Sequence, residues 1–119
     1  MSSKQGISSE LHDLTHLDEV EASILFRIDG NVVDSSFKEE YSHKLLRTIK
    51  WCKANVDKVS LEMKSSNLKK VTYELNEFCV IFYVVNNISI LTTISSKNAN
   101  LSLLSIESKR KALLIANYL

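Results

Sequence analysis

The sequence predicts an α/β domain with a five-stranded antiparallel sheet, strand order 2-1-5-4-3, and helices on both faces of the sheet. Three observations support this fold class. An Asp-Gly turn follows an apolar run, residues 78–85 are continuously apolar, and two long segments repeat apolar residues at helical spacing. A strand without a polar face is covered on both sides, so the sheet needs helices above and below it. The strand order follows if sequential strands pair and the fifth docks beside the first.

The chain is expected to begin with a disordered tail over residues 1–7, followed by one domain over residues 8–119. A length of 119 residues is typical of one domain, and the first residues are mostly small or polar, with Gly6 among them. Ser8 or Ser9 could cap a short first helix, whose apolar residues are Leu11, Leu14 and Leu17.

A β-hairpin is predicted around Asp29 and Gly30. Residues 22–28 are rich in β-branched and aromatic side chains, and residues 31–34 form a short second run that soon becomes polar, as in an edge strand. Glycine adopts the positive φ that tight hairpin turns require, and Gly30 is the only glycine of the predicted domain. The sequence is compatible with a loop of two residues or of three.

The longest helical pattern follows this hairpin. Ser36 and Glu39 fit a capping box at its start. A helix that continued to Met63 would be about 39 Å long, whereas a domain of this size is about 35 Å across, so we expect an end near residue 59. The apolar residues, which recur at steps of three and four, are Tyr41, Leu45, Thr48, Ile49, Cys52, Val56 and Val59.

Three strands come next, over residues 68–75, 78–85 and 88–94, with turns at residues 76–77 and 86–87. The first of them alternates, which is typical of a half-buried strand at the edge of a sheet. The side chains on its apolar side are Val71, Tyr73 and Leu75.

A final helix is predicted over residues 100–118. Its core stripe is expected to contain Leu101, Leu104, Ser108, Ala112, Ile115 and Leu119. Four further apolar residues lie off this stripe, namely Leu103, Ile106, Leu113 and Leu114. A helix that is apolar on more than one side is either deeply buried or in contact with a second protein.

The composition gives no sign of an enzyme, a cofactor or a metal site. The formal charge is +1, Cys52 and Cys79 are isolated, and no phosphate-binding loop or nucleophile-elbow motif is present. His12 and His16 have a spacing compatible with metal binding, but no third ligand is evident. No apolar run is long enough to span a membrane. We therefore expect a cytoplasmic protein, with no nucleic-acid partner and no direct membrane insertion.

Basic residues on the long helix form a candidate partner-binding surface. Lys44, Arg47, Lys50 and Lys53 lie off the apolar stripe of that helix. They form either a solvated surface or a site that could attract an acidic protein surface, anionic lipid or nucleic acid. Trp51 lies beside the apolar stripe, where it is either a core residue or an interface anchor, since tryptophan is enriched at binding hot spots.

The order of these elements resembles that of the roadblock/dynein light-chain family, which has a roadblock/profilin-like fold. The resemblance covers residues 9–119. It depends on Asp29-Gly30 in the hairpin, on the alternating and apolar strands, and on Ala99-Asn100-Leu101 at the start of the last helix. Two glycines of the family pattern are replaced here, by Glu19 before the first strand and by Ser102 in the last helix.

This resemblance implies a dimeric protein-interaction module. Members of the family are scaffolds or small-GTPase regulators, and in their dimers the third strands pair and the long helices pack side by side. The resemblance therefore implies a homodimer, or a heterodimer with another roadblock-like protein, that regulates or scaffolds a Ras-like small GTPase. The implied dimer interface consists of Val71, Thr72, Tyr73, Leu75 and Trp51.

Two alternative functions remain open from the sequence. One is a light-chain-type scaffold of a motor or membrane-trafficking assembly. The other is a PAS-like ligand sensor, because related sheets also build small-molecule-binding domains. A sensor needs an internal cavity, whereas the bulky residues of the apolar strand predict a filled core; these are Phe78, Ile81, Phe82 and Tyr83.

Overall fold

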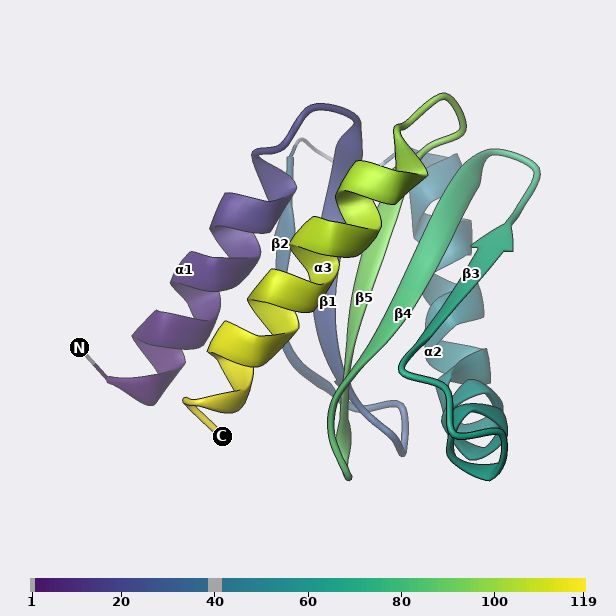
Figure 1. Ribbon diagram of the computed structural model, residues 1–119. Coiled ribbons are helices and arrows are strands. Elements are labelled where there is room, and N and C mark those ends of the chain that lie inside the picture. The colour runs from purple at the N-terminus through teal and green to yellow at the C-terminus, as the bar shows by residue number, and fades with distance from the viewer. Residues whose placement is uncertain (1, 39–41) are drawn as a thin grey trace.

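The computed structural model describes residues 2–38 and 42–119, and it contains a five-stranded antiparallel sheet (Figure 1). The strand order is β2-β1-β5-β4-β3, as predicted from the sequence. This confirms that the long connection between β2 and β3 crosses the sheet from one edge to the other. The strands are β1 (Val20–Arg27), β2 (Val32–Phe37), β3 (Lys70–Glu74), β4 (Phe78–Asn86) and β5 (Ser89–Ser96).

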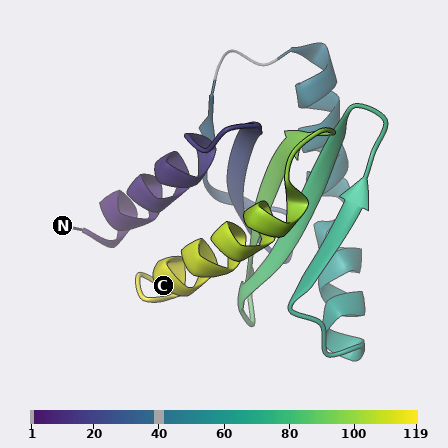
Figure 2. The same cartoon turned by 45° about the horizontal axis from the view of Figure 1, so that its top comes forward.

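Helices cover both faces of this sheet, as the apolar fourth strand requires. Helix α2 (His43–Ser65) lies on one face, and helices α1 (Ser3–Thr15) and α3 (Leu101–Ala116) lie side by side on the other (Figures 1 and 2). Phe82 of β4 packs in the core beneath α2, whereas its neighbour Ile81 packs with Leu104 of α3. Successive residues of β4 therefore serve two separate cores.

The N-terminal segment differs from the sequence prediction. Residues 3–7 belong to α1, which Ser2 caps: its side chain accepts a hydrogen bond from the Gln5 amide at 3.2 Å. Gly6 and Ile7 are buried, so the expected tail over residues 1–7 is wrong from Ser3 onward. A Cβ atom at Gly6 would overlap the ring of Tyr118 at the C-terminal end of the chain. Gly6 therefore allows the close approach of two segments that are distant in the sequence.

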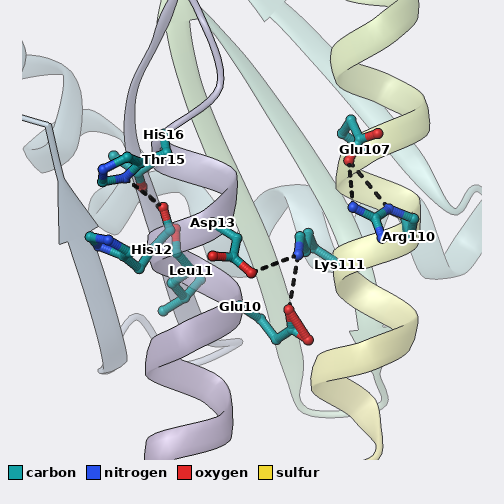
Figure 3. A network of polar contacts seen from close by, with 9 residues as sticks. All are labelled: Glu10, Leu11, His12, Asp13, Thr15, His16, Glu107, Arg110 and Lys111. Atoms are coloured by element: carbon teal, nitrogen blue, oxygen red, sulfur yellow. Dashed lines mark hydrogen bonds and ion pairs between the residues drawn. The ribbon is translucent and has the colours of Figure 1, made fainter.

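A buried lysine joins α1 to α3 (Figure 3). Lys111 of α3 is only 4% exposed. Its Nζ donates to Glu10 Oε1 at 2.9 Å and lies 3.4 Å from Asp13 Oδ2, and both carboxylates belong to α1. The charge of Lys111 is thus balanced within the helix layer, as a buried ammonium group requires.

Helix α2 begins later than predicted. Ser36 and Phe37 belong to β2, and the N-cap is Ser42, whose hydroxyl accepts a hydrogen bond from the Leu45 amide at 3.1 Å. The predicted capping box at Ser36 is therefore wrong. Glu39, its second residue, and Tyr41 of the apolar stripe lie outside the described residues.

The same helix ends later than predicted, at Ser65. Leu68 N donates to Met63 O at 2.8 Å and Asn67 N to Lys64 O at 3.3 Å, while Asn67 has a φ of 55°. This is a Schellman motif, in which asparagine takes the left-handed position that ends many helices. With its later start, the helix is about 35 Å long, which matches the longest dimension of the molecule, 35 Å.

The hairpin between β1 and β2 has a three-residue loop. Gly30 N donates to Arg27 O at 2.9 Å, and Arg27 N donates to Asn31 O at 2.8 Å. Gly30 has a φ of 92°, and a Cβ atom there would lie 3.2 Å from the Lys53 carbonyl oxygen of α2. Glycine is needed here both for the backbone conformation and for the close approach of α2 to the hairpin.

Glu19 occupies a position that favours glycine, as the family pattern suggests. Its φ is 71°, and its Oε2 accepts a hydrogen bond from Ser96 Oγ at 2.7 Å. A left-handed conformation costs a non-glycine residue about 1–2 kcal/mol. Glycine also increases the conformational entropy of the unfolded chain, which lowers the free energy of unfolding by about 0.4–1 kcal/mol.

We therefore expect Glu19→Gly to leave the free energy of unfolding unchanged or to raise it by up to about 1 kcal/mol. The matched control is Glu21→Gly within β1, where glycine should lower stability by about 0.5–1 kcal/mol. Urea unfolding of the two variants measures the difference. Equal destabilisation by both would show that Glu19 is not strained.

Candidate protein-interaction surface

Strand β3 lies at one end of the sheet and has a free backbone edge. Leu75 N donates to Phe78 O at 2.8 Å, and Val84 N donates to Lys69 O at 2.9 Å. Because hydrogen-bonding direction alternates along a strand, Val71 and Tyr73 also direct their backbone groups toward β4. The N–H and C=O groups of Lys70, Thr72 and Glu74 therefore point away from the sheet. Within the described residues, β4 is the only strand that pairs with β3.

Side chains on the α2 side of β3 pack onto an aromatic cluster. The ring centroids of Trp51 and Tyr73 are 5.3 Å apart, and those of Tyr73 and Phe82 are 5.9 Å apart. Burial raises the pKa of Tyr73, and the Glu62 carboxylate raises it further, so the phenol stays neutral at physiological pH. Val71 and Leu75 pack against the same core. This cluster fixes the position of β3 against α2.

Four of the five predicted dimer residues thus meet at the junction of β3 and α2. They are Trp51, Val71, Tyr73 and Leu75, all partly buried. Thr72 is exposed, and its side chain points to the opposite face of the sheet because successive strand residues alternate. Trp51 contributes to the core, so its substitution would disturb the fold as well as any interface.

The four predicted basic residues are all exposed, but they do not form one face. Lys44 Nζ lies 3.5 Å from Glu77 Oε2 in the turn between β3 and β4. The backbone of Lys53 instead approaches Gly30 in the hairpin on the other side of α2. Lys53 is nine positions after Lys44, about two and a half helical turns, which places the two lysines on opposite sides of the helix.

An open groove of about 620 Å³ lies between the start of α2 and the turn after β3. Its lining combines basic residues of α2 with acidic residues that the sequence did not identify as part of a site, and it includes Trp51. No sequence pattern could indicate this, because the turn meets α2 only in the folded chain. The lining residues are Lys44, Arg47, Thr48, Trp51, Glu74, Leu75, Asn76 and Glu77.

The described residues include the two cysteines and the pair of histidines considered in the sequence. They contain no group of three or more His, Cys, Asp or Glu side chains placed to hold a metal ion. His12 and His16 contact each other, and His16 Nδ1 lies 3.1 Å from the backbone oxygen of His12. Cys52 and Cys79 are free and buried, and burial raises the pKa of Cys52 to about 12. That thiol is therefore protonated at neutral pH and is a poor nucleophile.

The strand order, the two helix layers and the β3 edge beside a long α2 define a roadblock-like fold. MglC from Myxococcus xanthus is similar in structure, with a TM-score of 0.80 and 14% identity over 93% of this chain and 97% of that one. A Roadblock/LC7 domain from Streptomyces avermitilis has a TM-score of 0.71 and 13% identity over 94% and 93% of the two chains. The chain belongs to the AF0774-like protein family, whose model matches residues 3–109.

A further similar structure is an MglB with a tetrameric arrangement. Its TM-score is 0.80, with 11% identity over 99% of this chain and 90% of that one. No curated protein matches the sequence. Among the helices of the described residues, none combines the length and the apolar character needed to cross a bilayer.

Proposed function

We propose that this protein is a dimeric interaction module that regulates or scaffolds a Ras-like small GTPase in the cytoplasm. The observation that supports the dimer best is the unpaired edge of β3, where the backbone groups of Lys70, Thr72 and Glu74 point outward. An unpaired edge is a template for another strand, and the two β3 edges of a homodimer would satisfy each other. The proposed role is regulation or assembly of a partner, without catalysis by this chain.

The proposed dimer places a second α2 beside the first, in agreement with the family resemblance. The outer side of α2 would then be the surface that remains for the GTPase. Arg47 and Lys50 lie there one turn apart, both exposed. Lys44 is engaged by Glu77, and Lys53 lies toward the hairpin, so these two contribute less to the proposed contact.

A titration against the small GTPases of the source organism, in both nucleotide states, tests the proposal. We expect at least one GTPase to bind with a dissociation constant below about 100 μM. The double variant Arg47→Glu with Lys50→Glu should weaken this binding about tenfold or more, because its negative charges would repel an acidic partner. The matched control is Lys4→Glu with Lys97→Glu, which reverses the charge of two exposed lysines outside α2.

Solution mass measured on the same samples separates the two parts of the proposal. A dimer that binds none of the GTPases in either state would remove the GTPase from the proposal and leave the interaction module. A chain that stays at 13.5 kDa at high micromolar concentration would contradict the homodimer.

A further inference from the structure

Helix α3 carries an apolar stripe on the side that faces away from the sheet. Leu103, Ile106 and Leu113 are 51%, 63% and 63% exposed. Steps of three and seven residues keep them on one side of the helix. Leu104, Ser108 and Ile115, on the other side, are buried against the sheet. The sequence analysis therefore placed these three residues correctly off the core stripe. Of its two explanations for them, deep burial within one chain is excluded, because all three side chains are exposed.

Charged residues accompany this stripe in a self-complementary pattern. Arg110 lies between Ile106 and Leu113 along the same side of α3, and its Nη2 is 3.2 Å from Glu107 Oε2 (Figure 3). A hollow of about 200 Å³ lies beside Ile106, between α3 and the sheet. Its lining contains Lys70, Tyr83, Ser105, Ile106 and Lys109.

We propose that α3 pairs in antiparallel orientation with α3 of a second copy of this chain, about a two-fold axis midway between Ser108 and Lys109. A two-fold axis brings the same flank of both helices together. Glu107 then faces the partner's Arg110, and the reverse pair forms at the same time. Leu103 then lies level with the partner's Leu114 and one residue's rise, about 1.5 Å, from the partner's Leu113, which lies near the hollow beside Ile106. Both the apolar and the charged residues of the stripe thus have a complement in the second copy.

This contact is distinct from the proposed β3 pairing, because α3 and α2 lie on opposite faces of the sheet, and the two contacts adjoin each other only at Lys70, which also lines the hollow beside Ile106 (Figure 2). A chain that uses both contacts would assemble beyond a dimer, and a similar structure, the MglB described above, has a tetrameric arrangement. A helix of 16 residues is about 24 Å long, so the α3 contact is small and should be weak alone. It becomes stronger when another contact already links the chains, because the effective concentration rises.

Charge variants of Glu107 and Arg110 give a direct test. Glu107→Arg places two arginines in each copy, and Arg110→Glu places two glutamates, so like charges face each other across the axis. Each variant alone should associate through α3 at least about tenfold more weakly than the natural protein. An equimolar mixture of the two should recover the association, because every arginine then faces a glutamate of the other variant. Sedimentation velocity over increasing concentrations measures these differences.

Two controls distinguish the contact from loss of folding. Leu113→Lys should reduce the association, whereas Ile88→Lys, at an exposed apolar residue in the turn between β4 and β5, should not. Thermal unfolding reports whether the variants remain folded. The proposal is overturned if the natural protein shows no association that Leu113→Lys removes. It is equally overturned if the mixture of charge variants associates no better than each variant alone.

Discussion

Proline at Thr72 should prevent two copies of the protein from pairing through β3 while leaving each copy folded. The Thr72 N–H points away from β4, so its loss removes no hydrogen bond within the chain. In the proposed dimer, each of two such N–H groups would contribute about 0.5–1.5 kcal/mol, and the proline rings would obstruct the approaching strand. We therefore expect dimerisation to weaken by about a hundredfold or more.

Proline at the next residue should have the opposite effect. Tyr73 faces Val80 in the register of β3 with β4, and its N–H points toward that strand. Tyr73→Pro removes this ladder bond, as well as the ring that packs between Trp51 and Phe82. Losing the ladder bond leaves its acceptor in β4 unpaired, which costs about 1–3 kcal/mol, and the aromatic packing is lost as well, so the monomer itself should be destabilised.

Light scattering measures whether each proline variant dimerises, and urea unfolding measures whether its monomer is destabilised. Ser35→Pro is the matched control, because Ser35 lies on the opposite edge strand β2 and its N–H points away from β1, where it donates to the side chain of its neighbour Asp34 at 2.8 Å. This control should leave the solution mass unchanged. A Thr72→Pro protein that dimerises as well as the natural one would show that β3 is not the dimer contact.

Lys111→Ala should lower the free energy of unfolding by about 3 kcal/mol, the effect of breaking a buried ion pair. The substitution leaves the Glu10 carboxylate, whose side chain is 15% exposed, without its cation. The Asp13 side chain is 58% exposed, so its share of the interaction is small. Because Lys111 joins α3 to α1, the loss should appear first as release of α1 from the sheet.

Hydrogen exchange of the α1 amides, compared with that of β4, measures this release. Lys109→Ala is the matched control, since Lys109 is exposed and its truncation should change stability by less than about 0.5 kcal/mol. Removing both charges with Lys111→Met and Glu10→Gln should restore part of the stability, because no unpaired charge then stays buried. Equal stability of Lys111→Ala and Lys109→Ala would contradict the role given to Lys111.

Much of the candidate site could be predicted from the sequence because it depends on local periodicity. The alternation of residues 68–75 predicted an edge strand, and the structure confirms the edge position and the alternation for Lys70–Glu74. The continuous apolar run of β4 predicted two helix layers for the same reason. The groove beside Trp51 could not be predicted, because Glu74 and Glu77 reach α2 only through the tertiary fold.

The sequence alone determined the fold class, the position of Gly30 and the surplus of apolar residues on α3. Each of these follows from a repeat of two or 3.6 residues, or from a backbone conformation that few residue types adopt. The strand order followed from the general tendency of sequential strands to pair, together with the assumption that the fifth strand docks beside the first. The tertiary structure decided where α1 and α2 begin, which carboxylates balance the charge of Lys111, and how the basic residues are divided around α2. Gly6 shows the physical reason: its polar neighbours indicate a tail, but the ring of Tyr118, distant in the sequence, packs directly against its backbone. Contacts between distant segments leave no local pattern, so only the folded chain reveals them.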